Sequence, residues 1–235
     1  MQKILSVYVN LQDERLNLPS YLEHSPFIIS ICPASIKGNR FSNEGIGEVS
    51  RLLDNGCILG QRGYIGRCRY PHDDGTDPWH ENFCLYNNPL GLERQLELMS
   101  DGQKILADTF GIDPLVYAPI NHLFDEETIA AAQVLKYESM MDQNNFGVMP
   151  YDRHTLRIIP EAKIGDKEVE ESMAVYCHVA ALRERKVSRI IKQAELVLPE
   201  SIAPQNVSND LLVINEIRKR VRKYERDLDS LKKRP

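Results

Sequence analysis

The chain alternates short apolar runs with longer amphipathic stretches. The apolar runs are typical of buried strands and lie at residues 4–9, 26–32, 57–60, 115–117 and 173–177. Between them, apolar residues recur every three or four positions, which predicts helices over 45–53, 90–110, 125–135 and 183–194. Residues 137–160 alternate turn signals with further short strand candidates. This order of strands and helices predicts a mostly parallel sheet covered by helices.

Two helix ends carry local signals of their own. Asp125 precedes an apolar-periodic stretch and is followed by Glu126 and Glu127, which predicts that it is an N-cap whose neighbours complement the helix dipole. Gly111 directly follows Phe110, where a glycine suits the left-handed conformation that commonly ends a helix.

Polar side chains follow the ends of several predicted strands. Arg62 and Tyr64 come after the strand at 57–60, and His178 directly follows the strand at 173–177. Because the carboxyl ends of parallel strands meet at one rim, where ligand sites are usual, we expect these groups to converge. The strand ends expected at that rim are Val9, Gly60, Pro119 and His178.

A long connection at 64–88 carries reactive side chains. His72 and His80, with acidic neighbours, are ligand types that zinc accepts, although a solvated acidic turn explains the same residues. Trp79, the only tryptophan, either stacks on a sugar face or anchors the loop in the core. Loops of this length are usually functional or disordered, and the aromatic content of this one argues against disorder.

The composition is that of a globular protein with a full core, with 42% hydrophobic and 27% charged residues. The net charge of -5 disfavours non-specific binding to nucleic acid. The apolar runs are too short to span a membrane, and the N-terminal stretch lacks the features of a signal peptide, so we expect a cytoplasmic protein. The five cysteines form no C-x-x-C motif. We expect Cys32, Cys57 and Cys177 to be buried free thiols.

The C-terminal part is predicted to be separate from the sheet. Residues 199–208 are rich in Pro, Ser and Asn and predict a linker, and residues 209–232 predict a helix with an apolar stripe. Residues 208–235 carry nine Lys/Arg and five Asp/Glu, a net charge of +4. The stripe needs a partner surface, either the body of the same chain or the same helix of a second chain in a homo-oligomer. The domains are thus 1–200 and 201–235.

Several segments, in order, resemble the polysaccharide deacetylase-like family. Gly60-Gln61-Arg62-Gly63-Tyr64-Ile65-Gly66 resembles its Gly-x-His-Gly-Tyr-x-His stretch. Residues 109–122 resemble its Phe-Gly-x-x-Pro segment, residues 124–131 continue the likeness, and residues 27–33 resemble its second strand and proline. The resemblance covers roughly residues 3–180.

The resemblance implies a fold and a reaction. The fold is a distorted (β/α) barrel of about seven strands, here with a C-terminal helical extension. The reaction is metal-dependent removal of an acetyl group from an amino sugar. In it, two His and one Asp hold a metal that activates water, a second Asp is the base and a late His is the acid.

The family's site residues are only partly present when they are carried over position by position. The Asp pair falls on Val9-Asn10, the metal-binding histidines fall on Arg62 and Gly66, and the late His falls on His178. The proline motif at Tyr117-Ala118-Pro119 lacks its Arg. A guanidinium has no lone pair for a metal, and two unit charges about 4 Å apart repel by about 4 kcal/mol at an effective dielectric of about 20. We therefore expect no metal at Asn10, Arg62 and Gly66.

Two functions remain open from the sequence. One is a carbohydrate deacetylase with catalytic residues His178 and Asp13 and, if any metal binds, zinc at a relocated site using His72 and His80. The other is a non-catalytic barrel, without a cofactor, that binds a carbohydrate or a protein. The residues expected to contact the ligand are Arg62, Tyr64, Trp79, Asn121 and His122. Asp13 is also the expected partner of the Arg62 charge.

Overall fold

The computed structural model describes residues 2–9, 16, 18–34, 41–64, 90–120, 124–142, 148–151, 154–164 and 174–198. The strands are β1 (Gln2–Val9), β2 (Ile28–Ile31), β3 (Ile58–Arg62), β4 (Val116–Ala118), β5 (Ser139–Asp142), β6 (Val148–Tyr151), β7 (His154–Lys163), β8 (Ala174–His178) and β9 (Glu195–Leu196). The α-helices are α1 (Asn43–Asp54), α2 (Leu92–Phe110), α3 (Glu126–Val134) and α4 (Arg185–Gln193), and the 3-10 helices are η1 (Ser20–Leu22) and η4 (Val179–Arg183).

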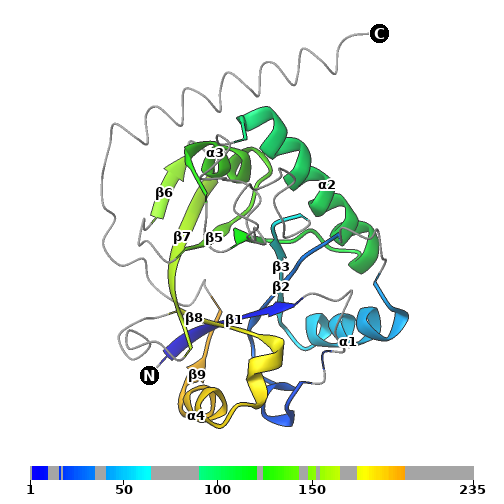
Figure 1. Ribbon diagram of the computed structural model, residues 1–235, viewed down its shortest axis with the longest axis vertical. Helices are drawn as coiled ribbons and strands as arrows, with labels where there is room; N and C mark the ends of the chain where they lie inside the picture. Colours follow the sequence, from blue (N-terminus) through cyan, green and yellow to red (C-terminus); the bar gives the residue numbers. More distant parts are fainter. Residues whose placement is uncertain are drawn as a thin grey trace, which may run out of the picture.

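Seven strands close into a parallel barrel. Going around the ring, β1 pairs with β2, then come β3, β4, β5, β7 and β8, and β8 pairs with β1 again. All of these pairings are parallel, so the carboxyl ends of the strands share one rim (Figure 1). The predicted barrel of about seven strands is confirmed, and so is the meeting of its strand ends.

The barrel departs from a regular β/α repeat in two places. β6 lies between β5 and β7 in sequence and pairs with β7 in the antiparallel direction, so a hairpin stands where a helix would normally follow β5. The helix predicted over 183–194 begins only at Arg185, because Glu184 is extended (φ -66°, ψ 136°) and separates α4 from η4. The short β9 then pairs with the start of β1.

Alternate residues of the strands face two different cores. On β1, Leu5 and Val7 face outward and pack in one cluster with Val49 of α1 and Val187 and Ile191 of α4. The intervening residues belong to an interior cluster that includes Ile4, Tyr8, Ile28, Val116, Met141 and Tyr176. The period of two along each strand therefore separates the helix-covered surface from the barrel interior.

Helix α2 lies unusually close to β3. Gly102 faces the sheet, and a Cβ there would meet the side-chain amide of Gln61 and lie 2.9 Å from Pro33 Cγ. Gln61 is fully buried and donates through Nε2 to the carbonyl oxygens of Gly63 (2.9 Å) and Met99 (3.2 Å). The Tyr137 hydroxyl donates to Gln61 Oε1 at 2.5 Å. Gln61 thus ties β3 to α2 and points away from the barrel interior.

Local signals in the sequence are confirmed at both predicted helix ends. Asp125 caps α3 by accepting from Thr128 N at 2.9 Å, and the Thr128 hydroxyl completes a capping box. Gly111 ends α2 with φ 75°, a left-handed conformation. Cys32, Cys57 and Cys177 are buried free thiols, as expected. Within the described residues, none of the helices has the length and apolar character needed to cross a membrane.

Candidate functional site at the barrel mouth

Four side chains from three strands meet at the carboxyl rim of the barrel. The Cα of Tyr8 on β1 pairs with that of His178 on β8, and Tyr176 lies two residues earlier on the same face. Arg62 is the last residue of β3. It lies two residues after Gly60 and so is on the same, interior-facing side of the strand. Because β1 and β2 lie between β8 and β3 in the ring, Arg62 reaches its neighbours from across the barrel mouth.

The Arg62 guanidinium lies over an aromatic ring and beside an imidazole. Its Cζ is 4.5 Å from the centroid of the Tyr8 ring, which is cation–π geometry. Its Nη1 is 3.4 Å from Nδ1 of His178. Tyr8 also contacts the Tyr176 ring at 5.1 Å between centroids and the His178 ring, edge-on, at 6.0 Å. Tyr8 therefore supports both Arg62 and His178.

The proton state of His178 follows from its surroundings. Loss of hydration is the largest cause, and the positive charges of Arg62 and Lys163 add to it, so that the pKa of His178 falls from 6.5 to about 4. His178 nevertheless keeps solvent-exposed surface at the end of β8. Because arginine can only donate, Nδ1 of the neutral ring accepts from Arg62 and Nε2 carries the proton. The bond is weak, since 3.4 Å exceeds the usual range.

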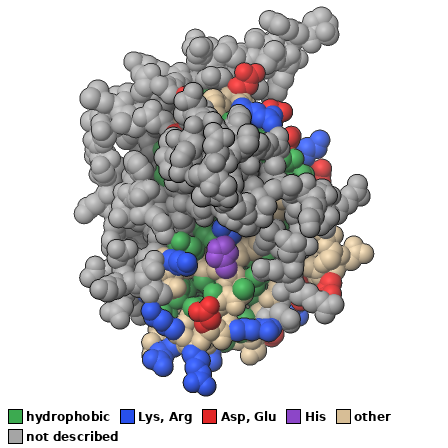
Figure 2. Space-filling view, viewed as in Figure 1, with side chains coloured by type: hydrophobic (Ala, Val, Ile, Leu, Met, Phe, Trp, Pro, Cys, Tyr) green, Lys and Arg blue, Asp and Glu red, His purple; other side chains and the backbone are tan. Residues whose placement is uncertain are grey.

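Lys163 brings a second cation to this corner of the rim. It is the last residue of β7, its Cα pairs with that of Tyr176 on β8, and its side chain is exposed. It is one of the two positive charges that act on His178. Figure 2 shows a histidine side chain with Lys or Arg side chains beside it on this face of the molecule.

Small residues line the barrel interior below this cluster on the β1–β2–β3 side. Ser6 and Ser30 are fully buried, and their hydroxyls have no hydrogen-bond partner among the described residues. A Cβ at Gly60 would lie 2.6 Å from Ser30 Oγ, so a larger residue there would have to displace the Ser30 hydroxyl.

The structure brings together two of the residues that the sequence singled out. Arg62 and His178 are in contact, 116 residues apart in the chain. Tyr64 lies just beyond β3, where its carbonyl oxygen accepts from Ala34 N at 2.9 Å and from Cys32 Sγ at 3.2 Å. The other predicted positions lie outside the described residues, namely Asn10, Asp13, Gly66, His72, Trp79, His80, Asn121 and His122.

Three members of the cluster were not selected from the sequence. Tyr8 and Tyr176 sit inside apolar strand runs, where an aromatic residue predicts ordinary core packing. Lys163 lies at the end of a strand whose boundaries the sequence left open. The available signal was the period of two, which places Tyr8 and Tyr176 on one face with His178.

The described part of the mouth does not fit a divalent metal. The group at the end of β3 is the Arg62 guanidinium, which offers no lone pair. Lys163 adds a second positive charge near the same imidazole. Across the described residues, no three His, Cys, Asp or Glu side chains group together as metal ligands would. A site relocated to His72 and His80 stays a prediction.

The chain is similar in backbone structure to several solved proteins. No protein-family model matches it, and no curated protein matches it significantly. A deacetylase solved with its substrate is 13% identical, with a TM-score of 0.51, over 87% of this chain and 93% of that one. The Xyl-CE4 domain of a multidomain xylanase from the hindgut metagenome of Trinervitermes trinervoides is 10% identical, with a TM-score of 0.50, over 88% and 94%. At these identities the likeness concerns the backbone arrangement, and the chain has the fold of the polysaccharide deacetylases.

Proposed function

We propose that this protein is a non-catalytic barrel that binds a carbohydrate at the mouth formed by Arg62, Tyr8, His178 and Lys163. The observation that carries the proposal is the Arg62 guanidinium itself, held over Tyr8 and beside His178. A cation in this place repels a divalent metal, and a guanidinium can donate hydrogen bonds to a ligand. The carbohydrate follows by analogy with the fold, whose solved examples include a deacetylase and a domain of a xylanase.

The state of His178 argues against its role as a general acid. A general acid must carry its proton at the working pH. With its pKa lowered to about 4, His178 is almost wholly neutral near pH 7. It can accept a hydrogen bond from Arg62 and donate through Nε2, which is the behaviour of a ligand-contacting residue.

Deacetylation through a relocated zinc site is the rival function. It would use metal ligands such as His72 and His80 and leave Arg62 as a substrate contact. Its support is the histidine at the end of β8, where the family has its late His.

A paired measurement separates the two functions. Purified protein is incubated with N-acetylated chito-oligosaccharides, with and without added zinc, and acetate release and bound zinc are measured. In parallel, binding of an oligosaccharide panel is measured by calorimetry in the presence of a chelator. We expect binding of an oligosaccharide, no acetate release and no stoichiometric zinc. Zinc-dependent acetate release that disappears in His72→Ala or His80→Ala would overturn the proposal in favour of the enzyme.

A further inference from the structure

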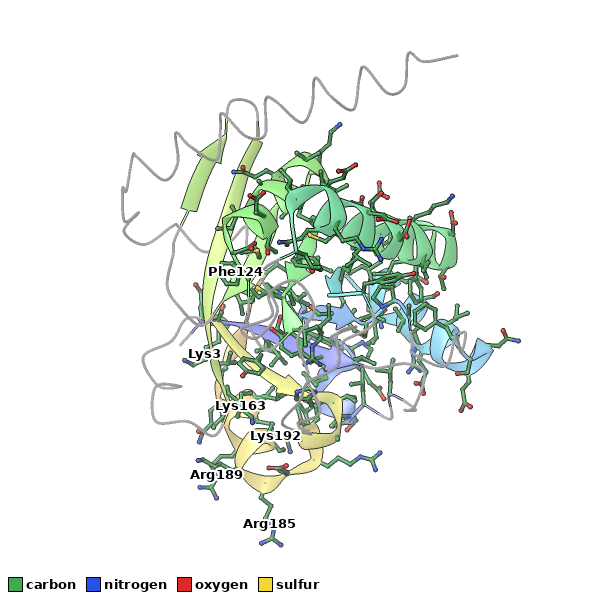
Figure 3. The ribbon with its side chains drawn as sticks, turned by 45° about the horizontal axis from the view of Figure 1, so that its top comes forward. Lys3, Phe124, Lys163, Arg185, Arg189 and Lys192 are labelled. Atoms are coloured by element: carbon green, nitrogen blue, oxygen red, sulfur yellow. The ribbon has the colours of Figure 1, made fainter. Side chains whose placement is uncertain are left out.

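The outward face of α4 carries only positive charge. Arg185, Arg189 and Lys192 follow one another at spacings of four and three residues, so they form one row along the helix, and all three are exposed. We call these three residues the basic row. On the opposite side of the helix, Val187 and Ile191 are buried in the core. None of the nine residues of α4 is acidic, and Arg185 and Arg189 point away from the barrel (Figure 3).

The basic row is unfavourable for the helix that carries it. Like charges three or four positions apart repel one another on a helix surface. Arg185 is also the first residue of α4, where the helix dipole disfavours a cation, and no side chain caps this end. Lys192 has its Nζ 5.0 Å from the centroid of the Tyr21 ring, a cation–π contact within its own chain. A helix face that departs from local preferences in this way is expected where the surface has a role beyond folding.

The outward face of α2 carries the opposite charge. The acidic row consists of four exposed carboxylates on one side of this helix, Glu93, Glu97, Asp101 and Asp108. Their spacings of four, four and seven residues place them in line, and Lys104 stands between the last two as a cation. Glu97 is ion-paired with Arg94 of the same helix. The carboxylates four positions apart repel one another, so this row has the same kind of local cost as the basic row, with the opposite sign.

The two rows do not meet within one chain. α2 and α4 lie at opposite ends of the molecule (Figure 1). The rows nevertheless match in length, because Arg185 to Lys192 and Asp101 to Asp108 each span seven residues, about 10.5 Å along a helix. The basic row can therefore face this acidic row only on a second copy of the chain.

We propose that copies of this chain associate through these two rows, with α4 of one copy lying along α2 of another. In this contact the guanidinium groups of Arg185 and Arg189 donate to carboxylates of the acidic row, which relieves the repulsion within both helices. Because the two faces differ, the contact is heterologous, and every copy offers both halves of it. The inference is independent of the function proposed for the barrel mouth.

The exposure of both rows determines how strong this association is. Exposed ion pairs are individually weak and are screened by salt. The screening length falls from about 30 Å at about 0.01 M salt to about 8 Å at about 0.15 M. We therefore expect sedimentation equilibrium of the full chain to show self-association at about 0.01 M salt, with an apparent dissociation constant that rises about tenfold or more by about 0.15 M.

Two charge-reversed variants test the pairing of the rows. The first, Arg185→Glu with Arg189→Glu, keeps the acidic row, and the second, Asp101→Lys with Asp108→Lys, keeps the basic row. The reversed charges at positions 185 and 108 suit the helix dipole, at the start of α4 and in the last turn of α2, so both variants should fold. We expect neither variant to associate alone. An equimolar mixture should associate, because each variant supplies the row that the other has lost.

A matched control separates the rows from the net charge. Arg51→Glu with Lys136→Glu reverses two exposed cations outside both rows and changes the net charge as much as the first variant does. We expect this control to keep the association of the wild type to within about threefold. A loss equal to that of the first variant would mean that net charge alone, and not the pairing of the rows, controls the association.

The remaining outcomes also overturn the inference. A mixture that associates no better than its two components would show that the rows do not pair. Association that persists in both variants would assign it to another surface, such as the helix expected over residues 209–232. A wild type that stays monomeric at low salt would contradict the contact. If that monomer sedimented with phosphatidylserine vesicles and the first variant did not, the basic row would belong to an anionic membrane surface instead.

Discussion

At the scale of single residues, Arg62 and His178 determine each other's chemistry. Burial and then the neighbouring guanidinium lower the pKa of His178, so the ring stays neutral and can accept from the guanidinium. Removing either residue should change the other in a measurable way.

Arg62→Gln should raise the pKa of His178 from about 4 toward 6.5, because one of the two positive charges that lower it is gone. The measurement is an NMR titration of the His178 ring in both proteins. Arg189→Gln is the matched control and should leave the titration unchanged. An unchanged His178 titration in Arg62→Gln would contradict the contact between the two side chains.

The same shift makes stability depend on pH. The folded pKa of about 4 lies below the ordinary value of 6.5, so between these values the unfolded chain binds the proton and the folded chain does not. The contribution is fully present above pH 6.5 and is lost as the pH falls toward 4. We expect the free energy of unfolding, measured in urea, to fall over this pH range. The fall should be larger for the wild type than for His178→Gln. Parallel curves for the two proteins would refute this.

At the scale of elements, the contact between α2 and β3 depends on one missing side chain. Gly102 lets α2 approach Gln61 and Pro33, and Gln61 in turn holds Met99 and Tyr137 by hydrogen bonds. β3 ends with Arg62, so this contact also fixes the strand that carries the rim arginine. The support of the site therefore lies partly outside the barrel.

Two glycine substitutions test this contact. Gly102→Ala should destabilise the protein by about 1–3 kcal/mol, because the methyl group overpacks against Gln61 and Pro33. Gly47→Ala, in α1 with nothing within 4 Å of the new methyl, should stabilise it by about 0.5–1 kcal/mol through helix propensity. Urea unfolding measures both. Stabilisation by both substitutions would mean that α2 does not pack as closely as described.

At the scale of the whole molecule, the barrel brings together residues that the sequence keeps far apart. β8 closes the ring against β1, and His178 thereby meets Arg62. The helix expected over residues 209–232 lies outside the described residues and stays a prediction, with its apolar stripe covered by its own barrel or by a second chain.

Deleting residues 209–235 tests those two alternatives by the mass in solution. We expect an unchanged mass apart from the deleted residues, because packing within one chain covers the stripe without an association step. Light scattering of the full and shortened chains at equal concentration makes the comparison. A change from dimer to monomer would show instead that the helix pairs two chains.

The sequence by itself determined most of the backbone. The apolar runs located the strands at 4–9, 26–32 and 173–177 to within about two residues, since burial on both faces requires continuous apolar character. Asp125 and Gly111 marked helix ends because a cap and a left-handed turn depend on local chemistry alone. The order of strands and helices was enough to predict a parallel sheet covered by helices, and the resemblance to the deacetylase-like family supplied its closure into a barrel.

Only the tertiary structure decided which side chains form the mouth. The sequence predicted ordinary core packing for Tyr8 and Tyr176 and singled out no role for Lys163, and ring closure places all three around Arg62 and His178. The sequence pattern also did not predict the hairpin of β6 and β7 or the break at Glu184. Periodicity does not encode the direction of strand pairing or a single extended residue. Contacts between β3 and β8 depend on the closure of seven strands, a long-range property that no local stretch of sequence specifies.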